Sequence, residues 1–174
     1  MMHTHCDALL CSAKCNLCKS KFNRYYSRNA AIDLIKLSDY TTIDVKLIEK
    51  LVGEVDVHSK EHYHYGVNVM EHAKASTLRA LLVGELNLKD EEHVSLLIKY
   101  LYTTYYYIEY MRNVFREHKP DVVTCIHGIY MEHGVLVDLC EALNIRIVIS
   151  GIPYKKNCLW FTVGDTYHRA ITYD

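Results

Sequence analysis

Two short apolar runs in the last third of the chain constrain its fold more than any other feature. They occupy residues 121–126 and 145–150, and the stretch between them has apolar residues at three- and four-residue spacing: Val135, Leu136, Leu139, Cys140 and Leu143. Runs of this length are typical of buried strands, whereas the spacing between them is that of one helix face. A strand, a helix and a second strand in this order form a parallel pair joined by a crossover helix, so the sequence predicts an α/β domain.

Small and ionisable residues follow the first run and point to a binding site. They are His127, Gly128, Glu132, His133 and Gly134. Ligands of open parallel sheets bind beyond the carboxyl ends of the strands. An imidazole there can exchange a proton near neutral pH, glycine lets the backbone approach a ligand, and the start of the next helix attracts anions. We therefore expect the site in this loop.

Two other segments add candidate residues. The segment 165–168 supplies the Thr166 hydroxyl and the His168 imidazole from a second loop. Arg79 follows several small residues on an expected helix, from which its guanidinium group could approach a phosphate; the alternative is an ordinary surface arginine. Two alternatives remain for the loop after the first run. Its side chains could bind a metal through His127, Glu132 and His133, or its two histidines could have purely structural roles.

Size and charge exclude several classes of protein. The chain has 174 residues, enough for one domain with its own core, and 20 basic against 21 acidic residues give a net charge of −1. No basic run interleaved with aromatic residues suggests a nucleic-acid partner. The sequence has no apolar stretch of about 18 residues and no signal-peptide pattern, so we expect a cytoplasmic protein without a transmembrane segment.

The first 27 residues form an expected cysteine-rich, irregular head, followed by a domain over residues 28–174. The chain has seven cysteines, an odd number that favours reduced thiols in such a compartment. Four of them could bind zinc, and the spacing of the last three also fits the iron–sulfur cluster of radical S-adenosylmethionine enzymes: Cys6, Cys11, Cys15 and Cys18. Cysteines without a metal are the third interpretation.

Helices are expected over residues 30–37, 44–52 and 66–83, and a long one from Asp90 to Lys119 that should lie across the sheet. The long helix carries six of the chain's 15 tyrosines. Packing is their expected role, although they could also form a carbohydrate-stacking surface or the contact of a homodimer. Because two strands are too few for a stable sheet, we expect the chain to be a fragment of a longer protein.

The motifs in their order along the chain resemble the N-terminal domain of bacterial capsular-polysaccharide and surface-glycan glycosyltransferases. The resemblance covers about residues 60–174. It rests on these segments: residues 66–67 and 75–79, Pro120 to Val123, His127-Gly128, Glu132-His133-Gly134, 142–145, 151–153 and 165–168.

The resemblance implies the first half of a GT-B architecture, in which two Rossmann-like domains with parallel sheets and flanking helices face each other. In that family the N-terminal domain binds the glycan acceptor and the C-terminal domain binds the nucleotide-sugar donor. His127 or Glu132 would then be the catalytic base, and the residues that bind substrate would be Gly128, His133, Gly134, Arg79, Thr166 and His168. This chain departs from the family in having no obvious first strand and no donor domain.

A non-catalytic module is the alternative function. In that interpretation the cysteine-rich head binds zinc and the tyrosine-rich helix docks a partner. No other cofactor is expected in either case.

Overall fold

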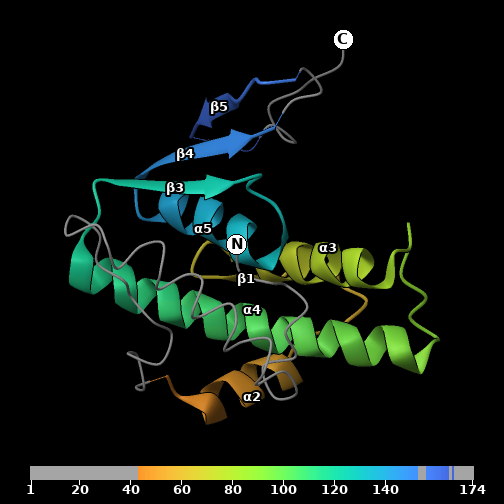
Figure 1. Ribbon diagram of the computed structural model, residues 1–174. Helices are drawn as coiled ribbons and strands as arrows, with labels where there is room; N and C mark the ends of the chain where they lie inside the picture. Colours follow the sequence, from red (N-terminus) through yellow and green to blue (C-terminus); the bar gives the residue numbers. More distant parts are fainter. Residues whose placement is uncertain (1–42, 153–155, 165, 167–174) are drawn as a thin grey trace, which may run out of the picture. The chain divides into compact units, whose positions relative to one another are not determined.

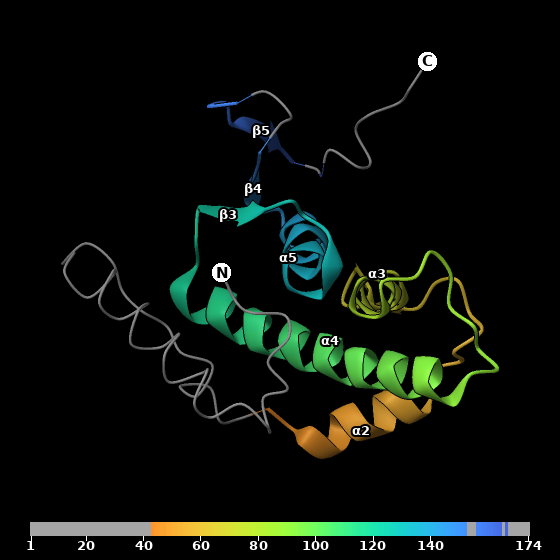
Figure 2. The same ribbon diagram turned by 45° about the vertical axis from the view of Figure 1, so that its right-hand side comes forward.

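The computed structural model describes residues 43–152, 156–164 and 166, which belong to one compact unit beginning at Thr42. The expected cysteine-rich head with Cys6, Cys11, Cys15 and Cys18, its boundary at residue 27, the expected helix at 30–37 and His168 lie outside the described residues. The described elements form an α/β arrangement in layers: a small sheet, then a pair of helices, then one long helix, then a short helix (Figures 1 and 2).

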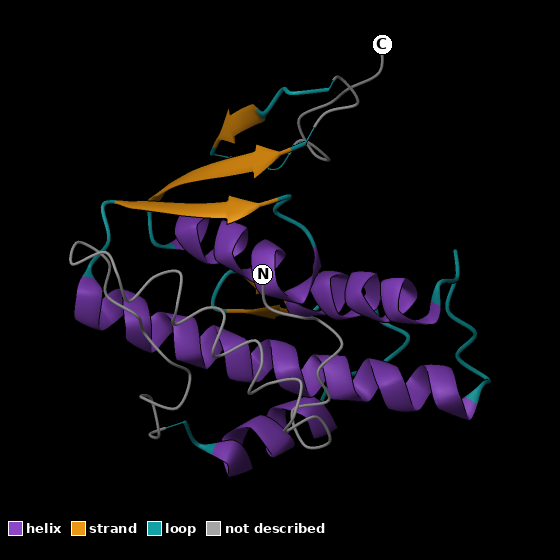
Figure 3. Ribbon diagram, in the orientation of Figure 1, coloured by secondary structure: helices purple, strands orange, loops and turns teal. Residues whose placement is uncertain are grey.

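The main sheet contains β3 (Val122–Ile126), β4 (Arg146–Gly151) and β5 (Trp160–Val163), in that spatial order. β3 and β4 are parallel, as the two apolar runs predict, but β5 pairs with β4 in the antiparallel direction. The described sheet is therefore mixed, and the expectation of a parallel sheet is correct for β3 and β4 and wrong for β5 (Figure 3). A short connection after β4 allows this antiparallel return, whereas another parallel strand would require a long crossover.

The crossover helix α5 (Tyr130–Ala142) lies against one face of this sheet. It begins five residues before the apolar spacing starts at Val135. Every residue from Gly134 to Cys140 is buried, so the helix is enclosed on all sides. The opposite face of the sheet exposes Val122, Ile126, Phe161 and Val163.

The long helix α4 (Glu91–His118) spans 28 residues, close to the predicted limits. The Asp90 side chain accepts hydrogen bonds from two first-turn N–H groups, and Lys119 ends the helix in a left-handed conformation. The helix packs mainly on α5, α3 and α2 instead of crossing the sheet, because α5 occupies that position. Although α4 is long, none of the described helices is both long and apolar enough to span a membrane.

The tyrosines of α4 contribute to packing. Tyr105 and Tyr110 are buried, and the remaining four are half-buried: Tyr100, Tyr102, Tyr106 and Tyr107. None of these six side chains is exposed enough to form the open stacking platform considered from the sequence. A homodimer through this helix stays a prediction.

The first described elements are α2 (Val45–Gly53), a hairpin of β1 (Tyr63–His64) and β2 (Val67–Asn68), and α3 (Val69–Leu81). The helix expected from Gly66 thus begins three residues later, because 67–68 pair with β1 and the Asn68 side chain caps the helix. It ends at Leu81, two residues before the predicted limit, and the next residue, Leu82, adopts a left-handed conformation.

Candidate functional site

His127 occupies a strained turn directly after β3. Its φ is +65°, and the Gly128 N–H donates a hydrogen bond to the Ile126 carbonyl at 2.8 Å across it. A bond between residues two apart around a positive φ defines the rarer, strained form of the γ-turn. The His127 N–H donates to the Ser150 carbonyl of β4 at 3.0 Å, which ties this turn to the carboxyl ends of both parallel strands. Strain of this kind persists only where the surroundings enforce it.

Gly128 and Thr166 hold that turn in place. Gly128 has a φ of +68°, and a Cβ atom at this position would lie 3.0 Å from the Thr166 Cβ and 3.1 Å from the Ile149 Cδ1. The Thr166 hydroxyl donates to the His127 carbonyl at 2.9 Å, and Thr166 is only 2% exposed. Side chains of the protein itself, and not a ligand, therefore occupy the space that the missing side chain of Gly128 leaves. Thr166 positions the turn and is too buried to contact a large ligand.

Arg79 reaches the start of α5 from the neighbouring helix α3. Its guanidinium carbon lies 4.4 Å from the centre of the Tyr130 ring, a cation–π distance. Tyr130 is the first residue of α5 and has a φ of +64°. One turn earlier on α3, the Ser76 hydroxyl accepts a hydrogen bond from the Met131 N–H at 2.9 Å. α3 thus caps the first turn of α5, where the N-cap residue Ile129 provides no side-chain bond.

His133 lies in the same region and is half-buried. Burial, and then the nearby His127 and Arg79, lower the pKa of His133 below its ordinary value. Its buried Nδ1 atom has no hydrogen-bond partner in the described part of the chain. His133 is therefore neutral at pH 7, and it lies within electrostatic reach of both other groups.

Glu132 faces the helical layer. It is 8% exposed, and its charge is among the factors that raise the pKa of Tyr107 on α4, after burial and Tyr110. Successive helix positions differ in direction by about 100°, and Glu132 lies within electrostatic reach of α4 while His133 lies within reach of Arg79. Neighbours in the sequence are thus separated in the fold.

Gly134 lies on the side of α5 that packs against α3. A Cβ atom there would overlap the His72 imidazole, whose Nε2 lies 2.7 Å from Asp138 Oδ2. The Asn68 N–H donates to the same carboxylate oxygen at 3.2 Å. His72 and Asp138 are 2% and 5% exposed. This buried pair joins α3 to α5, and Gly134 is a packing residue instead of a ligand contact.

The sequence reasoning missed this contact stripe on α3. His72, Ser76 and Arg79 lie at positions i, i+4 and i+7, which share one helix face, and each contacts α5. The glycine in the middle of α5 was the available signal, because such a residue costs stability unless another group approaches closely.

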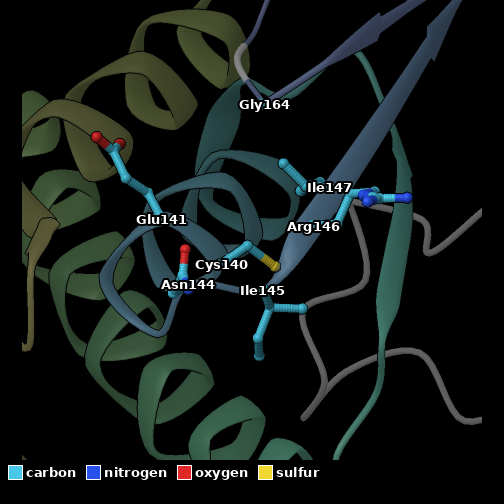
Figure 4. A pocket seen from close by; sticks show the side chains of 7 residues that line it. All are labelled: Cys140, Glu141, Asn144, Ile145, Arg146, Ile147 and Gly164. Atoms are coloured by element: carbon cyan, nitrogen blue, oxygen red, sulfur yellow. The ribbon is translucent and has the colours of Figure 1, made fainter.

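A pocket of about 270 Å³ lies at the other end of the sheet (Figure 4). Its lining comes from the end of α5, the start of β4 and the residue after β5: Cys140, Glu141, Asn144, Ile145, Arg146, Ile147 and Gly164. The charged side chains of Glu141 and Arg146 point away from each other. Burial, and then Cys125, raise the pKa of Cys140 to about 12, so its thiol is protonated and unreactive at pH 7.

Metal binding by the first loop receives no support. Among the residues that the structure describes, no three His, Cys, Asp or Glu side chains come close enough to hold an ion. Zinc binding by the four N-terminal cysteines stays a prediction.

Comparison of the chain with protein-family models, with curated proteins and with solved structures gave no match. The chemistry of the site must therefore be argued from its own geometry. The structure brings His127, Gly128 and Thr166 into contact, and places Arg79 and His133 within electrostatic reach beside them. Glu132 and Gly134 face α4 and α3 instead.

Proposed function

We propose that this chain is the acceptor-side half of a glycosyltransferase that extends a capsule or lipopolysaccharide glycan, with a Rossmann-like domain of the GT-B type. The observation that carries the proposal is His127, whose backbone a γ-turn fixes at the carboxyl ends of β3 and β4. That edge is where ligands bind in sheets of this kind. The order of motifs that resembles surface-glycan glycosyltransferases supports the same assignment.

In this proposal His127 is the general base. An acceptor hydroxyl oxygen forms a bond to the anomeric carbon of the donor sugar while the bond from that carbon to the nucleotide diphosphate breaks. The electron pair leaves with the diphosphate, and the hydroxyl proton passes to His127. We favour His127 over Glu132 as the base because Glu132 is only 8% exposed. A base must come within hydrogen-bond reach of the proton that it accepts.

Arg79 and His133 bind substrate in this proposal. Arg79 is exposed and positively charged at the start of α5, where the helix dipole also favours a negative group. His133 is neutral and can donate or accept a hydrogen bond without adding charge. These groups suit a phosphate or a polar sugar. Donor binding by a second domain belongs to the same proposal.

A transfer assay with the full-length gene product tests the proposal. The protein is mixed with radiolabelled nucleotide sugars and with membrane glycolipid from a strain that lacks the gene, and label in the glycan is counted. We expect transfer by the unchanged protein and a loss of at least about 100-fold in His127→Gln, the usual contribution of a general base. Glu141→Gln, an exposed change at the other end of α5, is the matched control and should retain transfer.

Two outcomes would overturn the proposal. One is the absence of transfer by the unchanged protein with every nucleotide sugar. The other is equal transfer by the unchanged protein and His127→Gln. Circular dichroism of each variant separates lost chemistry from lost folding.

A further inference from the structure

The β1–β2 hairpin carries two exposed aromatic side chains outside the site described above. Tyr63 is 60% exposed and Tyr65 is 50% exposed, although tyrosines elsewhere in the described residues are buried or half-buried. The tip of the hairpin lies against the carboxyl end of α5, because a Cβ atom on Gly66 would lie 2.7 Å from the Ala142 Cβ. Across the 13 residues of α5, this is about 20 Å from the His127 end.

Tyr65 stands in a backbone conformation that disfavours it. Its φ is +50°, and Gly66 follows with +83°, so both residues of the two-residue turn are left-handed. Turns of this type normally take asparagine, aspartate or glycine at the first position. An aromatic residue there raises the energy of the folded state. Such strain at an exposed position suggests a role other than stability.

Two side chains contact the Tyr65 ring, Arg112 over it and His64, whose ring centre lies 4.2 Å away. The Arg112 guanidinium carbon lies 3.2 Å from the ring centre, and Arg112 Nη1 donates to Glu109 Oε2 at 3.2 Å. Glu109 Oε1 is also 3.1 Å from His64 Nε2. The His64 ring is supported in turn by buried Tyr105, at 5.1 Å between centres. The exposed ring is therefore held in one orientation before any ligand arrives, which lowers the entropic cost of binding.

The charges of this cluster indicate the kind of ligand. Glu109 and Arg112 form an ion pair, with side-chain exposures of 18% and 33%, so the two charges cancel. Arg112 covers one side of the Tyr65 ring, while half of the residue remains exposed. What the cluster offers is an aromatic surface beside polar groups without net charge. A ligand with a flat apolar ring face bordered by hydroxyl groups is complementary to that surface. An anionic ligand would gain little binding energy there, because Glu109 already neutralises the charge of Arg112.

We propose that the hairpin surface made of Tyr65, Glu109 and Arg112 binds a neutral saccharide. A pyranose ring stacks on Tyr65, and its hydroxyl groups form hydrogen bonds with Glu109 and Arg112. The proposal goes beyond the transfer reaction and stands on the hairpin geometry alone. If the chain also extends a glycan, a second contact about 20 Å from His127 would hold the polymer while its end reacts.

A glycan array tests the proposal, with fluorescently labelled protein applied to neutral and anionic oligosaccharides. We expect the unchanged protein to bind neutral glycans. Tyr65→Asn should weaken binding at least tenfold, and because asparagine suits a left-handed turn, this variant should fold. Tyr65→Phe keeps the ring and should bind within about twofold of the unchanged protein. Phe161→Ala removes an aromatic ring of similar exposure, 62%, from β5 and should bind normally.

Three results would overturn the proposal. They are no bound glycan, equal binding by Tyr65→Asn, and binding restricted to anionic glycans. The glycan array and the transfer assay test the two proposals independently. Loss of glycan binding in Tyr65→Asn without loss of basal transfer to a short acceptor supports this surface alone. Tyr65-dependent binding by a chain that transfers no sugar would overturn the proposed enzyme and keep the proposed surface.

Discussion

The His72 imidazole and the Asp138 carboxylate lie 2.7 Å apart between α3 and α5, in a space that exists because residue 134 has no side chain. The two residues are 66 positions apart in the sequence. Their contact fixes how the two helices pack, and the same face of α3 then brings Ser76 and Arg79 to the start of α5. The position of the candidate site therefore depends on a buried polar contact some distance from it.

Gly134→Ala should destabilise the protein by about 1–3 kcal/mol, the usual cost of inserting an atom into a packed interior. The added Cβ would overlap the His72 ring. Gly53→Ala is the matched control, because Gly53 is also helical and has no atom within 4 Å of the added methyl group. It should be neutral or stabilising by up to about 1 kcal/mol. Urea unfolding measures both, and equal effects would contradict the packing role of Gly134.

Asp138→Ala should cost about 2–4 kcal/mol, because it leaves the buried His72 ring and the Asn68 N–H without their shared acceptor. A double-mutant cycle with His72→Ala isolates the interaction energy between the two side chains. We expect a coupling energy between about 0.5 and 3 kcal/mol, the range for contacting residues. Additive effects of the two substitutions would show that the contact contributes nothing specific.

His127→Gly should keep or raise the free energy of unfolding while it abolishes transfer. A φ of +65° is costly for histidine and free of steric cost for glycine, so the usual penalty of a glycine substitution is offset by about 1 kcal/mol. Thermal unfolding and the transfer assay measure the two effects. A variant both less stable and fully active would refute the assignment of strain and function to this residue.

The stability of the protein should fall in mild acid, partly because of His133. Burial, and then His127 and Arg79, lower the pKa of His133 in the folded state. As the pH falls through about 6.5, the unfolded chain takes up a proton there before the folded chain does. The free energy of unfolding therefore decreases by at most about 1.4 kcal/mol per pH unit from this residue, until the pH reaches the folded-state pKa.

The measurement for His133 is urea unfolding at pH 7.5 and at pH 5.0. His133→Gln should lose less stability between these values than the unchanged protein. Since the other histidines are present in both proteins, the difference isolates residue 133. An identical loss in both proteins would mean that His133 does not resist protonation.

Local signals in the sequence were enough for the long helix and the parallel strand pair. Asp90 begins α4 as a side-chain cap and Pro120 follows its end, so both limits could be predicted within a residue or two. The apolar runs gave β3 and β4 in the same way. The hairpin was missed because its strands have two residues each, too few for an alternating pattern.

The directions of side chains around α5 could not be predicted. Every residue from Gly134 to Cys140 is buried, whether apolar or not, so the apolar spacing does not indicate which neighbour each side contacts. Glu132, His133 and Gly134 were therefore expected at one site, whereas they face α4, Arg79 and α3. The antiparallel direction of β5 depends on the path of the chain after β4, which composition does not encode.

The hydrogen bond from Thr166 to the His127 carbonyl has a consequence for biosynthesis. The bond spans 39 residues, so in a nascent chain Thr166 cannot tie down the turn at His127 until the segment after β5 has left the ribosome. The contacts among α2, α3 and α4 involve earlier residues and can form before then. Polypeptides released before residue 166 would therefore retain most of their helical packing while the loop that carries the imidazole is left untied.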